Sequence, residues 1–544
     1  MTLPHRDNPY SFDQFLTRRN TFDYYRDDPF LRELVQKYSG DQWETLHQRL
    51  LEFSPRVSYR WRDLADNVAR PEVLPRIQHY DGHNHRIDRI ARPRETEILE
   101  REIFSQGLFS ARTTPWEHFV KRFLLHQNGE FGVMCPLACT EGLIVLLKYY
   151  PDHDTPELDQ ILLHCKEGID GDFGIGAQFM SEIQGGSDIP SNLLEARPDG
   201  KGYRLYGSKF FCSAMQADYA VVTARVTGSD KVGTFVAPAW LPGDKERERR
   251  NGYVINRIKW KMGTSELPTA EVEYQGAAAY AVGPVDRGVA SAVGIVLTLS
   301  RLAVGSSSGG AMLRAVREAL LYGRFRDVFG QKIQQFPLTA RQLEEMAEAA
   351  QRTTAGAFKV YDMFLRQGRK LQVGLKSDEP VEVQKQRFNL RELILMQKIS
   401  TAHECVDIIR KAMSIFGGHG VMEDFSSLPR LYRDAAVHEL WEGPRNVLLT
   451  QIYRDLQRAA RWYDPAEFAA TVLNGAPGHQ VEERVAQLNE LLKKPVLSVP
   501  NRASLMAAGE WESFCGRFFR VYQEQALREV GGEKPTINES LTNE

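Results

Sequence analysis

Apolar and polar positions change their spacing twice along the chain, and the two changes separate helical parts from a strand-forming part. Up to about residue 168, apolar residues recur every three or four positions, which is typical of amphipathic helices. From about Gly171 to Gly283 they form short β-branched or aromatic runs between Gly, Asp and Pro, which indicates strands. From Gly288 the helical spacing returns and continues to about residue 529.

The strand-forming runs are short, whereas the helical runs that follow them are long enough for a bundle. We expect strands at residues 203–206, 219–226, 232–237 and 270–274. We expect the bundle helices at residues 293–322, 339–367, 383–416 and 446–463. Shorter helices are expected at residues 30–38, 43–51, 95–106, 116–127, 136–148, 480–492 and 510–529.

The order of these elements predicts the fold class. Strands do not alternate with helices and no GxGxxG motif follows a strand, so a doubly wound parallel sheet is disfavoured. We predict a mainly α protein with a central, antiparallel and barrel-like β domain. The predicted parts are an N-terminal extension with a helical domain (1–170), the β domain (171–285), a helical bundle (286–455) and a helical C-terminal extension (456–544).

Composition describes an ordinary globular protein. The chain of 544 residues is 42% hydrophobic and 26% charged, with 69 Lys and Arg against 71 Asp and Glu. This balance gives no general attraction to nucleic acid or to anionic membranes. The N-terminal stretch lacks the apolar core of a signal peptide, and no apolar run reaches the ~18 residues of a membrane helix. We therefore expect a cytoplasmic protein without membrane contact.

Two stretches invite a metal-binding interpretation, and other interpretations are favoured for both. The six cysteines are scattered and form no pair of CxxC motifs, as expected for reduced, mostly buried thiols. Cys135 and Cys139 could share a helix face, but no His stands at a matching ligand spacing. The stretch from His79 to His85 contains Asp-Gly and Asn, which favour a polar turn or hairpin. No metal site is predicted.

One acid stands out near three-quarters of the chain. Glu442 lies between Trp441 and Gly443, after a helically spaced segment and before the helix-breaking pair Gly443-Pro444. A carboxylate packed between an aromatic ring and a turn loses water, and this desolvation raises its pKa toward the range of a general base. These residues alone favour the simpler alternative, a solvated Glu at a helix C-terminus.

Four further stretches could contact a ligand. The glycines of Ser181–Asp188 would let backbone approach a ligand closely, and Phe210-Phe211 followed by Ser213 could wall a planar ring. A helix ending at Gly330 could present Arg326 and Phe329 to a pyrophosphate and an adenine. The Gly-rich stretch Ser414–Val421 could place backbone amides against a phosphate. Taken singly, each stretch is also explained as a connecting loop, a core strand, a helix end or a turn.

Taken together and in order, these stretches resemble the motifs of the acyl-CoA dehydrogenase flavoprotein family over about residues 110–455. Ser181-Glu-Ile-Gln-Gly-Gly-Ser-Asp188 is similar to the family's T-E-x-x-x-G-S-D loop, and Gly207-Ser-Lys-Phe-Phe-Cys-Ser-Ala214 to its G-x-K-x-W-I-T-N strand. Arg326-Asp-Val-Phe-Gly330 is similar to R-x-x-F-G, and residues 415–421 and 431–444 to the two C-terminal motifs. The long extensions, with Trp441-Glu-Gly443 and Asn446, resemble the AidB-like branch of alkylation-response flavoproteins.

The resemblance implies FAD as cofactor and assigns roles to residues. Glu442 matches the catalytic base, which removes the α-proton of an acyl-CoA while the β-hydrogen leaves as hydride to flavin N5. Arg301 matches an Arg near the CoA moiety, and Ser187 is placed beside both substrate and cofactor. Arg326 and Phe329 are expected to reach across a dimer interface. The residues implied in FAD binding are Met180, Ser181, Gly186, Ser187, Phe211, Ser213, Arg326, Phe329, Gly417, Gly418, Trp441 and Asn446.

Three functions follow from this resemblance. The leading one is FAD-dependent α,β-dehydrogenation of a bulky or long acyl-CoA in fatty acid metabolism, by a homotetramer or homodimer that passes electrons to an acceptor such as an electron-transfer flavoprotein. The second is an AidB-like stress-response flavoprotein that binds DNA; residues 451–544 carry 11 Lys and Arg against 13 Asp and Glu, which disfavours it. The third is a flavin oxidase or monooxygenase on the same fold.

Overall fold

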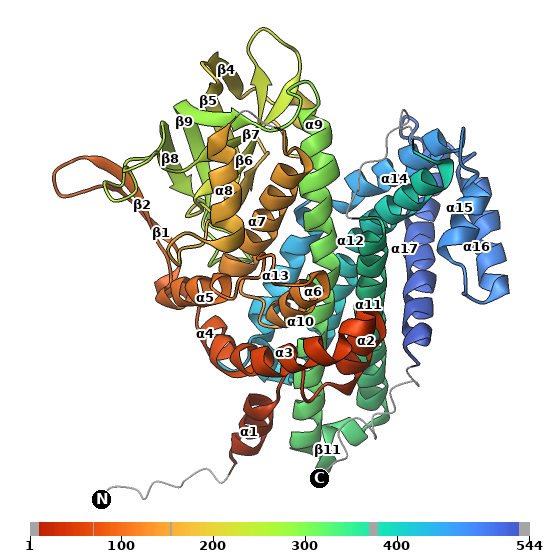
Figure 1. Cartoon of the computed structure of the whole chain (residues 1–544). Coiled ribbons are helices and arrows are strands. Elements are labelled where there is room, and N and C mark those ends of the chain that lie inside the picture. Colours follow the sequence, from red (N-terminus) through yellow and green to blue (C-terminus); the bar gives the residue numbers. More distant parts are fainter. Residues whose placement is uncertain (1–9, 69, 153–154, 369–378, 532–544) are drawn as a thin grey trace, which may run out of the picture.

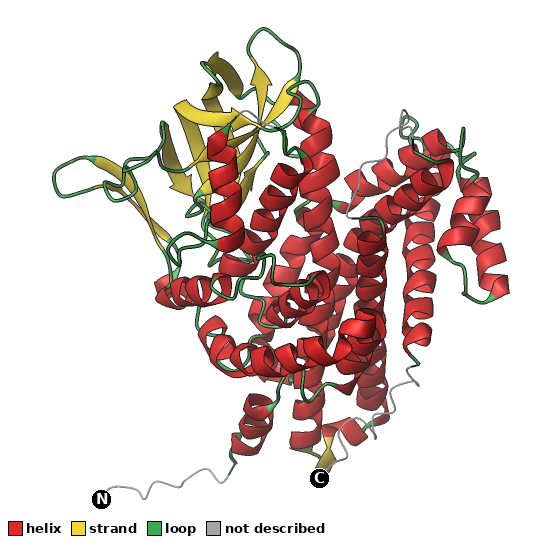
Figure 2. Ribbon diagram, viewed as in Figure 1, coloured by secondary structure: helices red, strands yellow, loops and turns green. Residues whose placement is uncertain are grey.

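The computed structural model describes residues 10–68, 70–152, 155–368 and 379–531. The strands of its seven-stranded sheet gather at one end of a larger helical body, and the last helices lie on the opposite side of that body (Figure 1). Figure 2 shows how helices dominate the architecture. The predicted fold class is confirmed: helices come first, a sheet domain follows, and long helices complete the chain.

The N-terminal part consists of short helices and one hairpin. The predicted polar turn at residues 79–85 joins two antiparallel strands, β1 (Arg76–Tyr80) and β2 (Arg86–Ala91). The predicted helix at 136–148 begins earlier, at Phe131, because the Glu130 side chain accepts a hydrogen bond from the Val133 N–H and caps it. The helices are α1 (Asp13–Thr21), α2 (Pro29–Ser39), α3 (Trp43–Pro55), α4 (Arg62–Ala65), α5 (Arg94–Phe104), α6 (Pro115–His126), α7 (Phe131–Tyr149) and α8 (Pro156–Glu167).

The sheet domain differs from the expectation in one respect, since it is mixed rather than wholly antiparallel. β6 pairs in parallel with both β3 and β4, and the remaining pairs are antiparallel. The pairings β6–β4–β5–β9–β7–β6 close a ring, so the domain is barrel-like as predicted. The strands are β3 (Gly176–Phe179), β4 (Glu195–Asp199), β5 (Gly202–Ser213), β6 (Tyr219–Val226), β7 (Val232–Pro238), β8 (Tyr253–Ile258) and β9 (Thr269–Ala281).

Long helices form the C-terminal half. Two of them approach closely at a glycine. A Cβ added to Gly305 of α10 would lie 2.1 Å from the Gln397 side chain of α12, so a larger residue would not fit there. The extension is tied to the bundle by the Trp511 indole, which donates to the Leu449 carbonyl at 3.0 Å. The helices are α9 (Gly288–Ser291), α10 (Thr298–Phe325), α11 (Pro337–Arg366), α12 (Val381–Ile415), α13 (Leu428–Leu440), α14 (Arg445–Ala459), α15 (Pro465–Val472), α16 (Gly478–Leu491) and α17 (Arg502–Val530).

Two described helices are long and apolar enough to cross a membrane by length and composition. They are α7 and the continuous helix Gly288–Phe325, which includes α9 and α10. In their most apolar windows, 72% and 67% of the residues are buried inside the protein. The hydrophobic character of both helices is therefore explained by their place in the core.

The end of α10 corrects one prediction. The helix ends at Phe325 rather than at Gly330, because the next residue, Arg326, takes an extended backbone conformation. Asp327–Val328 (β10) then pairs with Gln331–Lys332 (β11) around a turn in which Phe329 and Gly330 have φ of 51° and 82°. Phe329 is exposed, as predicted, at the tip of this small hairpin.

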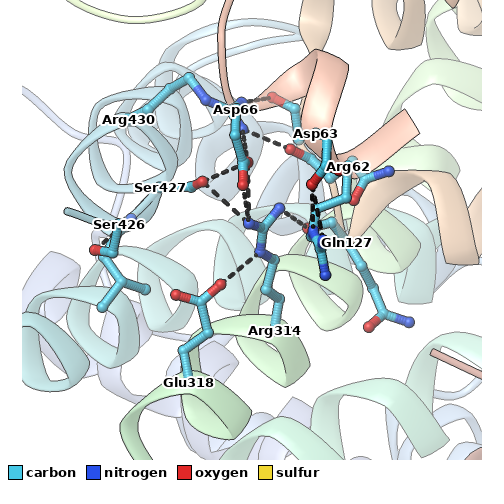
Figure 3. Close-up of polar contacts among 12 residues, drawn as sticks. Arg62, Asp63, Asp66, Gln127, Arg314, Glu318, Ser426, Ser427 and Arg430 are labelled. Atoms are coloured by element: carbon cyan, nitrogen blue, oxygen red, sulfur yellow. Dashed lines mark hydrogen bonds and ion pairs between the residues drawn. The ribbon is translucent and has the colours of Figure 1, made fainter. Parts of the chain in front are cut away.

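A buried ionic network joins the N-terminal part to the bundle (Figure 3). The Arg314 guanidinium, on α10, is fully buried and donates to Asp66 at 3.0 and 3.1 Å and to Glu318 at 2.9 Å. It also donates to the Ser427 hydroxyl at 3.0 Å, immediately before α13. Arg430 of α13 lies 3.6 Å from the same Asp66 carboxylate. One aspartate from the N-terminal part thus connects α10 with α13.

We expect Arg314→Met to lower the midpoint of thermal unfolding. The substitution leaves the buried Glu318 carboxylate without its hydrogen-bonded cation and removes the nearer of two cations from the partly buried Asp66. Breaking a buried pair in this way costs about 3–5 kcal/mol. Arg341→Met is the matched control, because Arg341 pairs with Glu345 at the same i, i+4 spacing but in an exposed position on α11. Its loss should cost less than about 1 kcal/mol. Equal midpoints for the two variants would contradict the structural role of the network.

Candidate functional site

Glu442 lies in a sharp turn between α13 and α14. α13 ends at Leu440, and Trp441 is extended. Glu442 and Gly443 then take left-handed backbone conformations with φ of 58° and 100°, and Pro444 precedes α14. A non-glycine residue in this conformation is strained by roughly 1–3 kcal/mol, and it stays there only where contacts with its surroundings offset that strain. The predicted helix end before the Gly-Pro pair is therefore confirmed, and the acid itself occupies the strained position.

Two buried cations hold this turn through its carbonyl oxygens. Arg301 of α10 donates from Nε to the Glu442 carbonyl at 2.8 Å. Lys398 of α12 donates from Nζ to the Gly443 carbonyl at 2.7 Å and to the Glu439 carbonyl at 3.1 Å. Hydrogen bonds from charged donors contribute about 1.5–3 kcal/mol each, which is enough to offset the backbone strain. We call Arg301 and Lys398 the carbonyl clamp.

The clamp leaves the carboxylate itself available. Glu442 is partly exposed as a residue, but its Oε2 atom is buried and has no hydrogen-bond partner among the described residues. Burial raises the pKa of Glu442 to about 7, while the charges of Arg301 and Lys398 act in the opposite direction. Burial also lowers the pKa of Arg301 to about 10 and that of Lys398 to about 8. Glu442 is thus poised to exchange a proton near neutral pH, which differs from the solvated Glu that its neighbouring residues alone favour.

An apolar cavity of about 50 Å³ adjoins Glu442. This volume corresponds to roughly three to five water-sized groups. Phe131, His126, His438 and Trp441 also line it. The two long walls come from Met134, Cys135, Ala138 and Cys139 of α7, and from Ser300, Ala303, Val304 and Ser307 of α10.

The first group of predicted cofactor residues lies on the β domain, close to this cavity. Gln178 of β3 donates to the Ser300 hydroxyl of α10 at 3.3 Å, so the loop that follows β3 starts beside the cavity wall. Met180 is buried, Ser181 is half-buried, and Gly186 and Ser187 are exposed. A Cβ on Gly186 would lie 2.7 Å from the Ser181 hydroxyl oxygen, which accounts for glycine at this position.

The same loop is fixed by a buried ion pair that sequence reasoning missed. Lys209 of β5 donates from Nζ to Glu182 at 2.8 Å, and both side chains are almost fully buried. Glu182 also accepts from the backbone N–H groups of Leu193 and Leu194 at 2.6 and 3.1 Å. The sequence signal was present, since both residues stand inside the quoted motifs. Their pairing over 27 positions was not visible in it.

Phe211 and Ser213 lie next to this loop. The Phe210 N–H donates to the Ser181 carbonyl at 2.9 Å, which sets β5 beside the loop. The Phe211 side chain is 49% exposed, although Lys259 lies over its ring at 4.7 Å from the ring centroid. Part of this large aromatic ring is therefore open to a ligand. The Ser213 hydroxyl lies 3.0 Å from that of Thr269. Trp441 stacks on His438 with ring centroids 5.1 Å apart.

The second group of predicted cofactor residues lies far away, at the other end of α10. Residues 301 and 326 are 25 positions apart, which corresponds to roughly 37 Å along a helix. Arg326 lies over the Tyr10 ring, with 4.9 Å from guanidinium carbon to ring centroid. Gly417 and Gly418 are exposed, and added Cβ atoms there would meet nothing within 4 Å. His419 links them to this end through a 3.1 Å contact with the Tyr322 hydroxyl.

Asn446, also a predicted cofactor residue, lies in a separate open cleft. The cleft has a volume of about 550 Å³ and is lined by Arg391, Arg454 and Arg458 together with Asp455. Arg391 pairs with Asp455, which leaves Arg454 and Arg458 as additional positive groups in the wall. The cleft suits a phosphate-bearing ligand. Arg454 and Arg458 stand four positions apart on α14, whereas Arg391 comes from α12 and joins them only in the folded chain.

Comparison with known proteins identifies similar sequences and folds. Residues 286–457 match the family described as acyl-CoA dehydrogenase, C-terminal domain. The chain is 29% identical over 449 residues to acyl-CoA dehydrogenase family member 11 of Caenorhabditis elegans, covering 79% of this chain and 70% of the relative. It is 28% identical over 445 residues to the putative acyl-CoA dehydrogenase AidB of Escherichia coli strain K12, covering 79% and 77%.

A solved structure extends the similarity to nearly the whole chain. The crystal structure of Caenorhabditis elegans ACDH-11 in complex with C11-CoA superposes with a TM-score of 0.77 at 24% identity. The superposition covers 98% of this chain and 95% of that one. At this identity the likeness concerns the fold, which includes both the N-terminal part and the C-terminal extension.

Proposed function

We propose that the chain is a member of the acyl-CoA dehydrogenase family that removes hydrogen from the α and β carbons of a short acyl-CoA, with Glu442 as the base. Members of this family are FAD-dependent oxidoreductases. The observation that carries the proposal is a buried carboxylate with a pKa of about 7 next to an apolar cavity. Such a group can take the α-proton of a thioester whose acyl chain fills the cavity.

The residues on the β domain fit an FAD molecule. The exposed Phe211 ring, the half-buried Ser181 and the exposed Gly186 and Ser187 offer an aromatic wall beside a polar loop. Asn446 in the arginine-lined cleft fits a phosphate-bearing end. When bound, FAD would supply the acceptor for the β-hydrogen, which leaves as hydride. The chain's own task is to orient the thioester and hold the base.

The left-handed turn also supplies a hydrogen-bond donor. As the α-proton leaves, negative charge develops on the thioester oxygen, and a fixed donor there stabilises it. The backbone N–H of Glu442 donates to no described residue. Because the carbonyl clamp fixes the peptide groups on both sides, this N–H is held in one orientation. We propose that it binds the thioester oxygen while the Glu442 carboxylate accepts the proton.

We also propose that the protein acts as a homodimer or a larger homo-oligomer. Arg326 and Phe329 follow the far end of α10, and Gly417 and Gly418 lie beside that end through the His419–Tyr322 contact, so these residues are too distant to share a ligand with Ser181 of the same protomer. A second copy could present them to the cofactor. We further propose that an electron-transfer flavoprotein accepts the electrons removed from the substrate.

We expect Glu442→Gln to retain FAD and to lose reduction of the flavin by acyl-CoA, by on the order of 10²–10⁴-fold in rate. The measurement is anaerobic titration of the purified protein with short, long and branched acyl-CoA, followed by flavin absorbance. Glu439→Gln is the matched control, because the same change three residues away alters a side chain that contacts His403 at 2.9 Å. Absence of bleaching of the wild-type flavin by any acyl-CoA would refute the proposal.

The pH dependence of flavin reduction should follow Glu442. The base must be deprotonated, so the rate should rise about tenfold per pH unit below about 7 and level off above it. Lys398→Met removes a charge that lowers the pKa of Glu442, so the midpoint should move to higher pH by on the order of one unit. Lys411→Met, at an exposed pair with Asp407 on the same helix, should leave the profile unchanged. An unchanged midpoint in Lys398→Met would be evidence against this electrostatic coupling.

DNA binding is the second candidate function, and the arginine-lined cleft is the observation that favours it. Arg391, Arg454 and Arg458 could contact phosphates, although residues 451–544 carry a net charge of −2. We expect no shift of duplex DNA in a gel at near-physiological salt. Tight binding that weakens in Arg454→Ala and Arg458→Ala would instead favour the DNA-binding function.

A further inference from the structure

The cavity beside Glu442 contains more polar groups than α-proton removal requires. His126 of α6, Ser307 of α10 and His438 of α13 all line it, and their exposed fractions are 3%, 4% and 1%. They come from three helices that are remote in sequence. The proposed reaction uses Glu442 and gives none of the three a role.

None of these groups has a hydrogen-bond partner among the described residues. This holds for both ring nitrogens of His126, both ring nitrogens of His438 and the Ser307 hydroxyl oxygen. A buried polar group left in this state costs about 1–3 kcal/mol. Packing alone does not account for the cost at His438: it lies between the Phe131 and Trp441 rings, where a phenyl ring would pack without it. The unpaired groups therefore point to a ligand.

The charge state of the cavity defines that ligand. Burial lowers the pKa of His438 to about 3 and that of His126 well below its usual value, so both imidazoles are neutral at neutral pH. A neutral imidazole offers one donor and one acceptor. Contact with the Cys135 thiol, together with burial, holds the pKa of the Cys139 thiol, another lining group, well above its usual value. No Lys or Arg side chain is among the described residues that line the cavity, and an ionised Glu442 would repel a second anion, so an anionic acyl group is disfavoured.

We propose that the preferred substrate is a short acyl-CoA whose chain carries a hydroxyl group beyond its β carbon, bound in the cavity by His126, His438 and Ser307. A hydroxyl both donates and accepts, and so matches neutral imidazoles and a serine hydroxyl. The small volume limits the chain to a few non-hydrogen atoms. This inference rests on the proposed function, because it assumes that the cavity receives the acyl chain.

The test measures binding separately from catalysis. The FAD-loaded Glu442→Gln variant is titrated by calorimetry with 4-hydroxybutyryl-CoA against pentanoyl-CoA, and with 5-hydroxypentanoyl-CoA against hexanoyl-CoA. Each pair matches a hydroxyl with a methyl group of similar size. We expect the hydroxylated member of at least one pair to bind with a Kd lower by about tenfold or more, because a site built to hydrogen-bond a hydroxyl rejects an analogue that lacks it.

Further variants assign the preference to the cavity. Adding Ser307→Ala or His126→Phe should reduce the preference by about tenfold. Adding Ser308→Ala should leave it unchanged, because the Ser308 hydroxyl is equally buried and unpaired but does not line the cavity. If the alkyl members bind as tightly as the hydroxylated ones, the inference is overturned, while reduction of the wild-type flavin by pentanoyl-CoA would leave the proposed function standing. If no thioester binds or reduces the flavin, both are overturned.

Discussion

The geometry and the pKa of Glu442 both depend on two buried cations, Arg301 and Lys398. Arg301 and Lys398 are buried beside Glu442, yet their hydrogen bonds go to main-chain carbonyls of the turn rather than to the carboxylate. A direct ion pair would hold the carboxylate ionised and weaken it as a base. Without nearby cations, burial alone would raise its pKa further. The carbonyl clamp thus fixes the strained backbone and moderates the pKa with the same two charges.

The clamp depends in turn on the register of the bundle. Arg301 and Arg314 stand on the same helix, and Arg314 is tied to Asp66 of the N-terminal part and to Ser427 before α13 (Figure 3). α13 leads directly into the Glu442 turn. The Arg301 donor on α10 and the Glu442 carbonyl that accepts from it after α13 are therefore both positioned by one buried network. This gives the N-terminal part a physical connection to the site.

The sequence patterns predicted those structural features that depend on residues close together in the chain. The fold class, the hairpin around His79–His85 and the helix end before Gly443 all follow from spacing and turn residues within short windows. Contacts between distant residues could not be predicted in this way: Arg301 and Glu442 are 141 positions apart, and Lys398 and Gly443 are 45 apart. The parallel pairing of β4 with β6 was missed for the same reason, because β5 separates them in sequence.

Under the proposed function, the positions of the predicted cofactor residues call for more than one copy of the chain. Ser181 and Phe211 lie on the part of the β domain that meets the start of α10 through Gln178 and Ser300, whereas Arg326, Phe329 and Gly417 lie at or beside the opposite end of α10, roughly 37 Å away along the helix. A rigid helix cannot bring the two groups together by a local movement, because the spacing is set by its backbone hydrogen bonds. If both groups bind one FAD molecule, they must come from different copies of the chain. The exposed Phe329, which has little to pack against in its own protomer, is then a contact that only assembly can bury.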